Sequence, residues 1–213
     1  MKTAATEMLG IEFPIFAFSH CRDVVAAVSK AGGIGVLGAV AHSPEQLEID
    51  LKWIEDEIGD RPYGVDLIVP AKYAGDEGGG YTLDDIRALI PDTHREYIDD
   101  ILRRYDVPEF PPDEERASGR STGGHGGVAP FSAAAAGPQL EISLAHKPAF
   151  VATALGPPPQ FLIDRVKVEG RLVGALAGRP VHAERHQAAG VDIIIAQGSE
   201  AGGHTGEIGS MVL

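Results

Sequence analysis

Short apolar runs alternate with amphipathic segments over the first third of the chain. Mostly apolar runs at residues 14–18, 34–37 and 63–69 have the length of buried strands. Between them, residues 22–31 and 44–58 carry apolar positions three and four apart, which predicts a helix in each segment. The resulting order is strand, helix, strand, helix, strand.

Residues at the start of the second helix mark where it begins. Ser43 precedes the helix, Pro44 occupies the first helical position, and Gln46 follows the serine by three residues. This spacing is typical of a capping box with proline in the first turn. It predicts a helix from Pro44 to about Ile58.

The same alternation resumes in the last third of the chain. The predicted elements there are a helix at 139–146, a strand at 149–154, a helix at 158–169, a strand at 172–175, a helix at 180–189 and a strand at 193–196. Six β units separated by helices favour an α/β fold with right-handed parallel crossovers, and they do not fit a β-sandwich.

Residues 75–137 interrupt this alternation. Their clusters of glycine, proline and serine favour an irregular insertion around short helices at 83–90 and 94–104. In a barrel the insertion follows the third strand, where it could cover the mouth as a lid. The alternative, over residues 108–130, is a disordered surface loop. The whole chain, 1–213, is expected to form one partial barrel domain that contains this insertion.

A glycine pattern at residues 33–38 fits the G-x-G-x-x-G fingerprint of dinucleotide-binding folds. That fingerprint must follow a strand and open a helix. Here it follows a predicted helix and contains the strand, so the dinucleotide-binding fold is not favoured. The glycines are better explained by a helix stop and tight packing.

The segment from Gln197 to Gly206 places one histidine, His204, among glycines directly after a predicted strand. In barrels of parallel strands, catalytic and binding residues lie just beyond the carboxyl ends of the strands. Glycines let backbone N–H groups approach a bound group closely, and an imidazole titrates near pH ~6.5. The segment therefore predicts an active-site loop.

This loop resembles the corresponding Ala-Gly-Gly-His-x-Gly motif of the nitronate monooxygenase family, which are FMN-dependent (β/α)8 TIM barrels related to flavin-dependent enoyl-thioester reductases. The resemblance continues through further segments in the family's order, at residues 10–15, 31–38, 63–67, 154–156 and 188–192. It is unclear only over about residues 75–145. The resemblance implies a barrel-type α/β fold, incomplete here, with a flavin site.

Roles for individual residues follow from the resemblance. His204 is expected to act as the base on the carbon acid. The residues expected to contact FMN are Ala17, Phe18, Ser19, Asp66, Gln197, Gly198, Gly202 and Gly203. Phe18 and Ser19 depart from the Ala-Pro-Met that relatives often carry. Asp66 stands where many relatives have asparagine, and a carboxylate cannot donate a hydrogen bond as an amide does.

The implied activity is oxidation of alkyl nitronates by molecular oxygen to a carbonyl compound and nitrite, with FMN as cofactor and a small molecule as substrate. Two alternatives stay open. One is enoyl-thioester reduction, which would need a nicotinamide donor. The other is a catalytically inert, truncated barrel, because six β units leave two short of eight and a complete barrel takes ~250 residues.

The missing units carry the loops that hold a phosphate in such barrels, so weak FMN binding is expected. The open sheet edges predict an insoluble chain or one that pairs with another copy.

Composition narrows the partners and the location. Acidic residues outnumber basic ones by 31 to 18, a net charge of −13 that opposes binding to nucleic acid or anionic membranes. No apolar stretch approaches the ~20 residues of a membrane span, and the first ten residues lack a secretory apolar region, so a cytoplasmic location is expected.

Two further features concern metal chemistry. Cys21 is the only cysteine, which rules out an intrachain disulfide and a cysteine-based metal site. His182 and His186 stand four apart on a predicted helix, a spacing that can chelate a metal. Their segment lacks the H-E-x-x-H order, so we interpret them as a solvated pair and predict no metal site.

Overall fold

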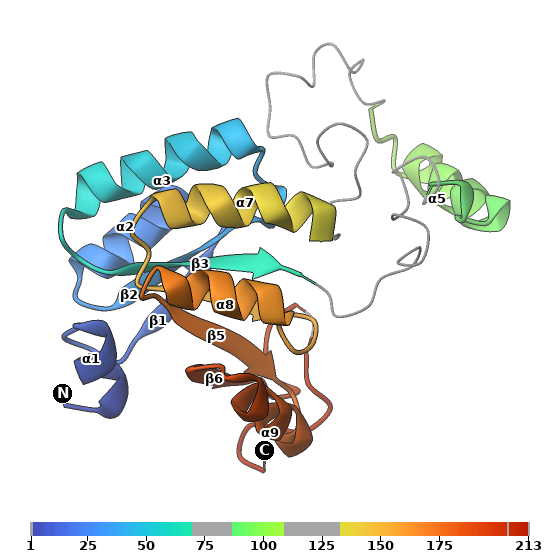
Figure 1. Ribbon diagram of the computed structural model, residues 1–213. Helices are drawn as coiled ribbons and strands as arrows, with labels where there is room; N and C mark the ends of the chain where they lie inside the picture. The colour runs from blue at the N-terminus through green and yellow to red at the C-terminus, as the bar shows by residue number, and fades with distance from the viewer. Residues whose placement is uncertain (1, 70–86, 109–132, 204, 213) are drawn as a thin grey trace.

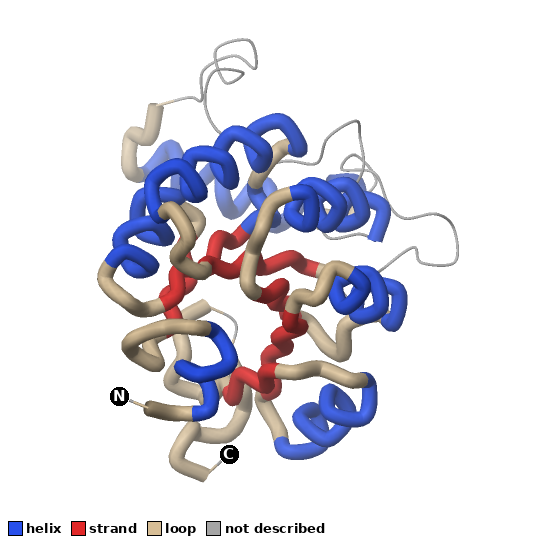
Figure 2. The backbone as a smooth tube through the Cα atoms, turned by 60° about the vertical axis from the view of Figure 1, so that its left-hand side comes forward, coloured by secondary structure: helices blue, strands red, loops and turns tan. Residues whose placement is uncertain are grey.

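The computed structural model describes residues 2–69, 87–108, 133–203 and 205–212. Within these ranges six parallel strands form one sheet in the order β1-β2-β3-β4-β5-β6. Figure 2 shows the sheet curled into part of a barrel with helices around its outside. The structure confirms the predicted α/β fold of incomplete barrel type.

The six strands are β1 (Phe16–Ser19), β2 (Ile34–Gly38), β3 (Tyr63–Ile68), β4 (Phe150–Ala154), β5 (Leu172–Ala177) and β6 (Ile193–Ala196). The described helices are α1 (Ala4–Leu9), α2 (Arg22–Lys30), the short 3-10 helix η1 (Ala39–Ala41), α3 (Pro44–Ile58), α5 (Asp92–Arg104), α7 (Ala133–Ala145), α8 (Gln160–Val168) and α9 (Pro180–Ala189).

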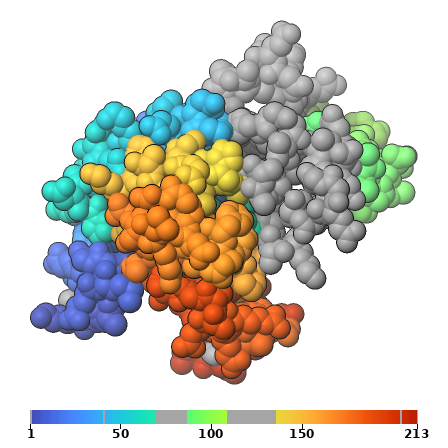
Figure 3. Space-filling view, in the orientation of Figure 1, coloured from blue at the N-terminus to red at the C-terminus, as the bar shows by residue number. Residues whose placement is uncertain are grey.

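The helices α2, α3, α7, α8 and α9 cover the outer face of the sheet (Figure 1). In the space-filling view, α3, α7 and α8 form one continuous layer (Figure 3). The core beneath this layer consists of outward-facing strand residues and the apolar faces of the helices; it includes Leu37, Leu47, Leu51, Val65, Leu67, Val151, Leu162 and Val173. Burial of these side chains is the main force that holds the helices on the sheet.

Side chains on alternate strand positions face the interior of the curl. On β3, Val65 and Leu67 are buried under the helices, whereas Asp66 faces the interior. A second, smaller apolar cluster fills one end of this interior and includes Leu9 and Ile11 beside inward-facing strand residues. Helix α1, which the sequence pattern did not predict, closes that end of the barrel.

The packing of the Phe150 ring in the barrel interior requires a glycine at the neighbouring position of β3. Phe150 on β4 is fully buried, and a Cβ added to its neighbour Gly64 would lie 2.5 Å from the Phe150 ring. We expect Gly64→Ala to lower the free energy of unfolding by about 1–3 kcal/mol, because the ring must move. Urea denaturation measures this change.

Gly202→Ala in the exposed loop after β6 is the control, since no heavy atom beyond its chain neighbours lies within 4 Å of its added Cβ. Alanine there should be neutral or stabilising. Equal losses of stability in the two variants would contradict the packing argument.

Element boundaries differ from the sequence prediction mainly at α7. This helix begins at Ala133 and contains Pro138, whereas the sequence analysis predicted a helix at 139–146. Gln139 and Ser143 are buried on α7, and the Gln139 amide donates to the Ala39 and His42 carbonyls at 3.0 and 3.1 Å. We attribute the longer helix to this tertiary packing, which local propensity does not contain.

The insertion is described only in part. Helix α5 confirms the helix predicted at 94–104, and it has no buried residue. Half of the helix predicted at 83–90, and nearly all of the loop predicted at 108–130, lie outside the described residues. In the described ranges, no helix combines the length and apolar character that crossing a bilayer requires.

Candidate active site

The interior of the curled sheet holds a pocket of about 910 Å³. Inward-facing residues of all six described strands line it, and the loops after β4, β5 and β6 complete its wall. A pocket at the carboxyl ends of parallel strands is where barrel folds place their chemistry.

One wall consists of two aromatic rings at the end of β1. The rings of Phe18 and His20 meet edge to face with centroids 5.1 Å apart. They pack over Gly38 of β2, where an added Cβ would lie 2.6 Å from the Phe18 ring and 2.7 Å from the His20 ring. The His20 Nδ1 lies 3.0 Å from the Gly38 carbonyl oxygen. When Nδ1 carries the ring proton, it donates a hydrogen bond to this oxygen. This leaves Nε2 as the other ring nitrogen for a ligand.

The other two residues predicted on β1 are not among the pocket-lining residues. Alternation along the strand puts Ala17 and Ser19 on the opposite side from Phe18. The Ser19 hydroxyl accepts a hydrogen bond from the Cys21 N–H at 3.0 Å, just before α2 begins. Its side chain therefore supports the start of α2.

Asp66 lies inside the pocket on β3. Its backbone pairs with Gly38 on one side and with Ala152 on the other. The carboxyl Oδ1 is buried and has no hydrogen-bond partner among the described residues. Loss of hydration on burial raises the pKa of Asp66 from 3.8 to about 7. A substantial fraction of this carboxyl is therefore neutral near pH 7.

The predicted glycine loop closes the pocket at β6. Gln197, Gly202 and Gly203 all line it. The loop packs tightly at Gly206, where an added Cβ would lie 2.2 Å from the Gln197 carbonyl oxygen. Gly198 is not a lining residue, and an added Cβ there would meet the Ser210 hydroxyl at 2.2 Å.

His204 lies outside the described residues. Its described neighbours in the chain, Gly203 and Thr205, both line the pocket.

The sequence analysis missed three charged or titratable groups of the pocket besides His20. Arg179 and His182, at the start of α9, line it together with Glu207, and Arg179 forms an ion pair with Glu207. Arg179 and His182 follow the carboxyl end of β5. Because residues after the carboxyl ends of parallel strands usually form the active site, they could have been predicted in the same way as the loop after β6.

The interpretation of His182 and His186 as a solvated pair is wrong for His186. His186 is fully buried, and its Nε2 lies 2.8 Å from the Leu176 carbonyl of β5. It ties α9 to the sheet, whereas His182 is half-buried at the pocket. The two histidines are one helical turn apart on α9, yet one is buried against the sheet and the other lines the pocket. The described part of the chain contains no cluster of three or more potential metal-ligating side chains.

The chain matches known proteins over its whole length. The family described as nitronate monooxygenase matches residues 2–213. "Putative monooxygenase Rv1533" of Mycobacterium tuberculosis is 54% identical over 100% of this chain and 55% of its own length. "Probable nitronate monooxygenase" of Staphylococcus saprophyticus is 28% identical over 97% of this chain and 51% of its own. The chain thus spans about half the length of these curated relatives.

Two solved structures share the fold. A nitroalkane oxidase of Streptomyces ansochromogenes superposes with a TM-score of 0.68 at 24% identity, covering 96% of this chain and 51% of that one. FabK of Thermotoga maritima gives a TM-score of 0.64 at 22% identity, covering 100% of this chain and 49% of that one.

Proposed function

The chain belongs to the nitronate monooxygenase family, and from this premise we propose that its pocket binds FMN and oxidises alkyl nitronates with molecular oxygen. The products are a carbonyl compound and nitrite. The observation that carries the proposal is the convergence of Phe18, Asp66, Gln197 and the 202–203 glycines on one pocket at the carboxyl end of the sheet.

The pocket suits the flavin ring system in size and lining. Its volume of about 910 Å³ falls within the roughly 300–1,000 Å³ of small-molecule sites. We propose that the Gln197 amide meets the polar edge of the ring and that Gly202 and Gly203 offer backbone N–H groups. Bound FMN would supply the redox chemistry.

This chain's own residues would handle the proton and the orientation of the substrate. We propose that His204 removes the proton from the carbon next to the nitro group of a neutral nitroalkane. The rings of Phe18 and His20 would keep water from one side of the pocket. A preformed nitronate has already lost that proton and needs only orientation.

Flavin binding and oxygen consumption test this function. With FMN in excess, the chain should quench flavin fluorescence and consume oxygen when ethyl nitronate is added, releasing nitrite. Oxidation of a nicotinamide donor with an enoyl thioester, and no oxygen uptake with the nitronate, would instead indicate the reductase. Absence of flavin binding and of both activities would contradict the proposal.

We also propose that the open sheet edges join two copies of this chain. Among the described residues, β1 and β6 each pair with one strand only. Ile194 on β6 is an exposed apolar residue on one of these edges. Such edges are templates for pairing with another chain. Sedimentation should show a dimer or larger assembly, and a monomer at every concentration would exclude this pairing.

A further inference from the structure

Among the described residues, Asp66 has neither an ion-pair partner nor a hydrogen-bond partner for its buried oxygen. Oδ1 is shielded from solvent and has no partner among the described residues. The backbone positions beside Asp66 are Gly38 and Ala152, whose small size leaves the carboxyl facing the pocket. An unsatisfied buried oxygen costs free energy, and a ligand that pairs with it recovers that cost.

Few other groups among the described residues of the pocket could set the charge of Asp66, and His204, proposed above as the base, lies outside those residues. Among the described lining residues, β1 contributes His20, α9 contributes Arg179 and His182, and the last loop contributes Glu207. Arg179 is already paired with Glu207. The neighbouring strands contribute only apolar or small side chains, Val36 from β2 and Ala152 and Ala154 from β4.

We propose that Asp66, in its neutral form, donates a hydrogen bond to one oxygen of the nitro or nitronate group of the substrate. The identity of this ligand rests on the function proposed above. A carboxylic acid donates through its O–H, whereas a carboxylate only accepts. A neutral donor facing an anionic oxygen forms a strong charge-assisted hydrogen bond. An ionised Asp66 would repel the same oxygen.

This arrangement makes the binding of an oxyanion depend on the proton of Asp66. Because burial raises the pKa of this carboxyl to about 7, the donor is present in slightly acid solution and is lost in slightly alkaline solution. Above pH 7 each bound anion must bring a proton with it. Its affinity then falls about tenfold for each pH unit. An asparagine amide at this position would donate at any pH, so the dependence requires the aspartate.

Nitrate is a suitable probe because it is a planar oxyanion that the proposed reaction does not consume. Titration calorimetry at pH 6 and pH 8.5 should show roughly 10- to 30-fold weaker nitrate binding to the wild-type chain at the higher pH. In Asp66→Asn the affinity should change by only a few-fold. Any change that remains there comes from other ionisable groups, which both proteins share. Proton uptake, obtained from buffers of different ionisation enthalpy, should be smaller in the variant because Asp66 no longer contributes to it.

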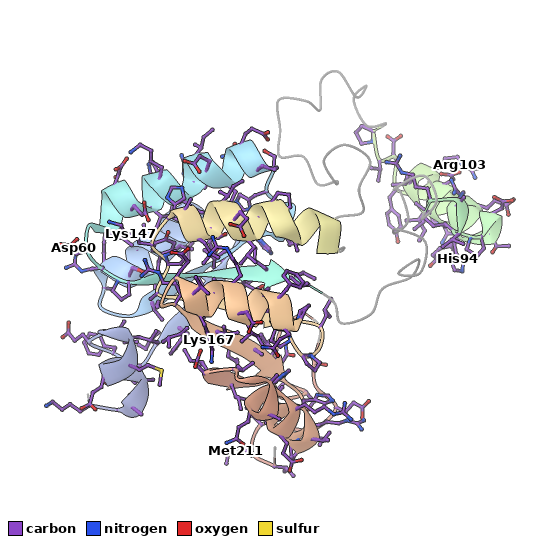
Figure 4. All side chains as sticks on the ribbon, viewed as in Figure 1. Asp60, His94, Arg103, Lys147, Lys167 and Met211 are labelled. Atoms are coloured by element: carbon purple, nitrogen blue, oxygen red, sulfur yellow. The ribbon has the colours of Figure 1, made fainter. Side chains whose placement is uncertain are left out.

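Asp60→Asn is the control, because it removes an exposed carboxylate in the turn after α3, at the periphery of the molecule (Figure 4). It should keep the wild-type pH dependence. The same pH dependence in wild type and Asp66→Asn would overturn the inference. So would the absence of nitrate binding to the wild type at pH 6.

The nitrate experiment can be run with and without FMN, which separates this inference from the proposed function. Asp66-dependent nitrate binding without nitronate oxidation would retain the oxyanion site and remove the proposed activity. If the affinity for FMN shows the Asp66-dependent pH change and nitrate does not, Asp66 faces the flavin and the inference is wrong.

Discussion

His204→Ala is expected to slow the oxidation of neutral nitroalkanes by about 10²- to 10⁴-fold, the usual contribution of a general base. Oxidation of preformed nitronates should stay close to the wild-type rate. The difference arises because a neutral nitroalkane must lose a proton before it can be oxidised, whereas a nitronate has none to lose. Initial rates of oxygen consumption, with FMN in excess, measure both reactions.

His94→Ala is the matched control. His94 lies exposed on α5, away from the curled sheet (Figure 4), so its removal should alter neither rate. Equal losses on both substrates in His204→Ala would show that this histidine binds the substrate or supports the loop and does not act as the base.

Much of the fold could be predicted from local patterns. Helix α3 begins at Pro44, with the Ser43 hydroxyl accepting a hydrogen bond from the Gln46 N–H at 2.9 Å, as the capping pattern predicted. The Gln46 side chain does not complete the capping box, because it donates to Asp50 at 2.9 Å. Asp50 is held by Arg22 of α2 as well, at 2.9 Å. The contact between Arg22 and Asp50 joins residues far apart in the sequence, so a local motif cannot predict it.

The loop after β6 could be identified as part of a site from the sequence, because it carries a glycine-rich motif and directly follows a predicted strand. Gln197, Gly202 and Gly203 therefore lie at the pocket as predicted. His20 and His182 carry no motif, and they reach the pocket only because the sheet curls and brings β1 and α9 to the same mouth. Which of two helix histidines faces the sheet likewise depends on how the helix is rotated. His186 shows that spacing alone does not determine this rotation.

The second prediction of large effect concerns the dependence of stability on pH. Asp66→Asn should become progressively more stable than the wild type as the pH rises from about 4 to about 8. Asp66 has a pKa of about 7 in the folded protein, against an ordinary value of 3.8. Between these two values the unfolded chain has released a proton that the folded chain still holds, so the stability of the wild type falls as pH rises. Above pH 7 both states are ionised and the loss is complete.

The size of this effect follows from the difference between the two pKa values. At about 1.4 kcal/mol for each unit, the loss from the wild type is ~4 kcal/mol at most. Asparagine has no proton to lose at this position and escapes the whole penalty. In a chain of this length the thermal midpoint of Asp66→Asn should therefore exceed that of the wild type by roughly 5–15 °C at pH 8. At pH 4 the two midpoints should lie much closer together.

Thermal and urea unfolding of the wild type, Asp66→Asn and Asp60→Asn across this pH range test the prediction. The other ionisable groups of the pocket are present in all three proteins, so their contributions cancel in the comparison. Asp60 is exposed, so its replacement removes a charge without relieving any burial, and this variant should follow the wild type. If the profiles of wild type and Asp66→Asn run parallel from pH 4 to pH 8, the carboxyl of Asp66 is already ionised at neutral pH in the folded chain. The oxyanion donor inferred for the pocket would then have no proton to donate.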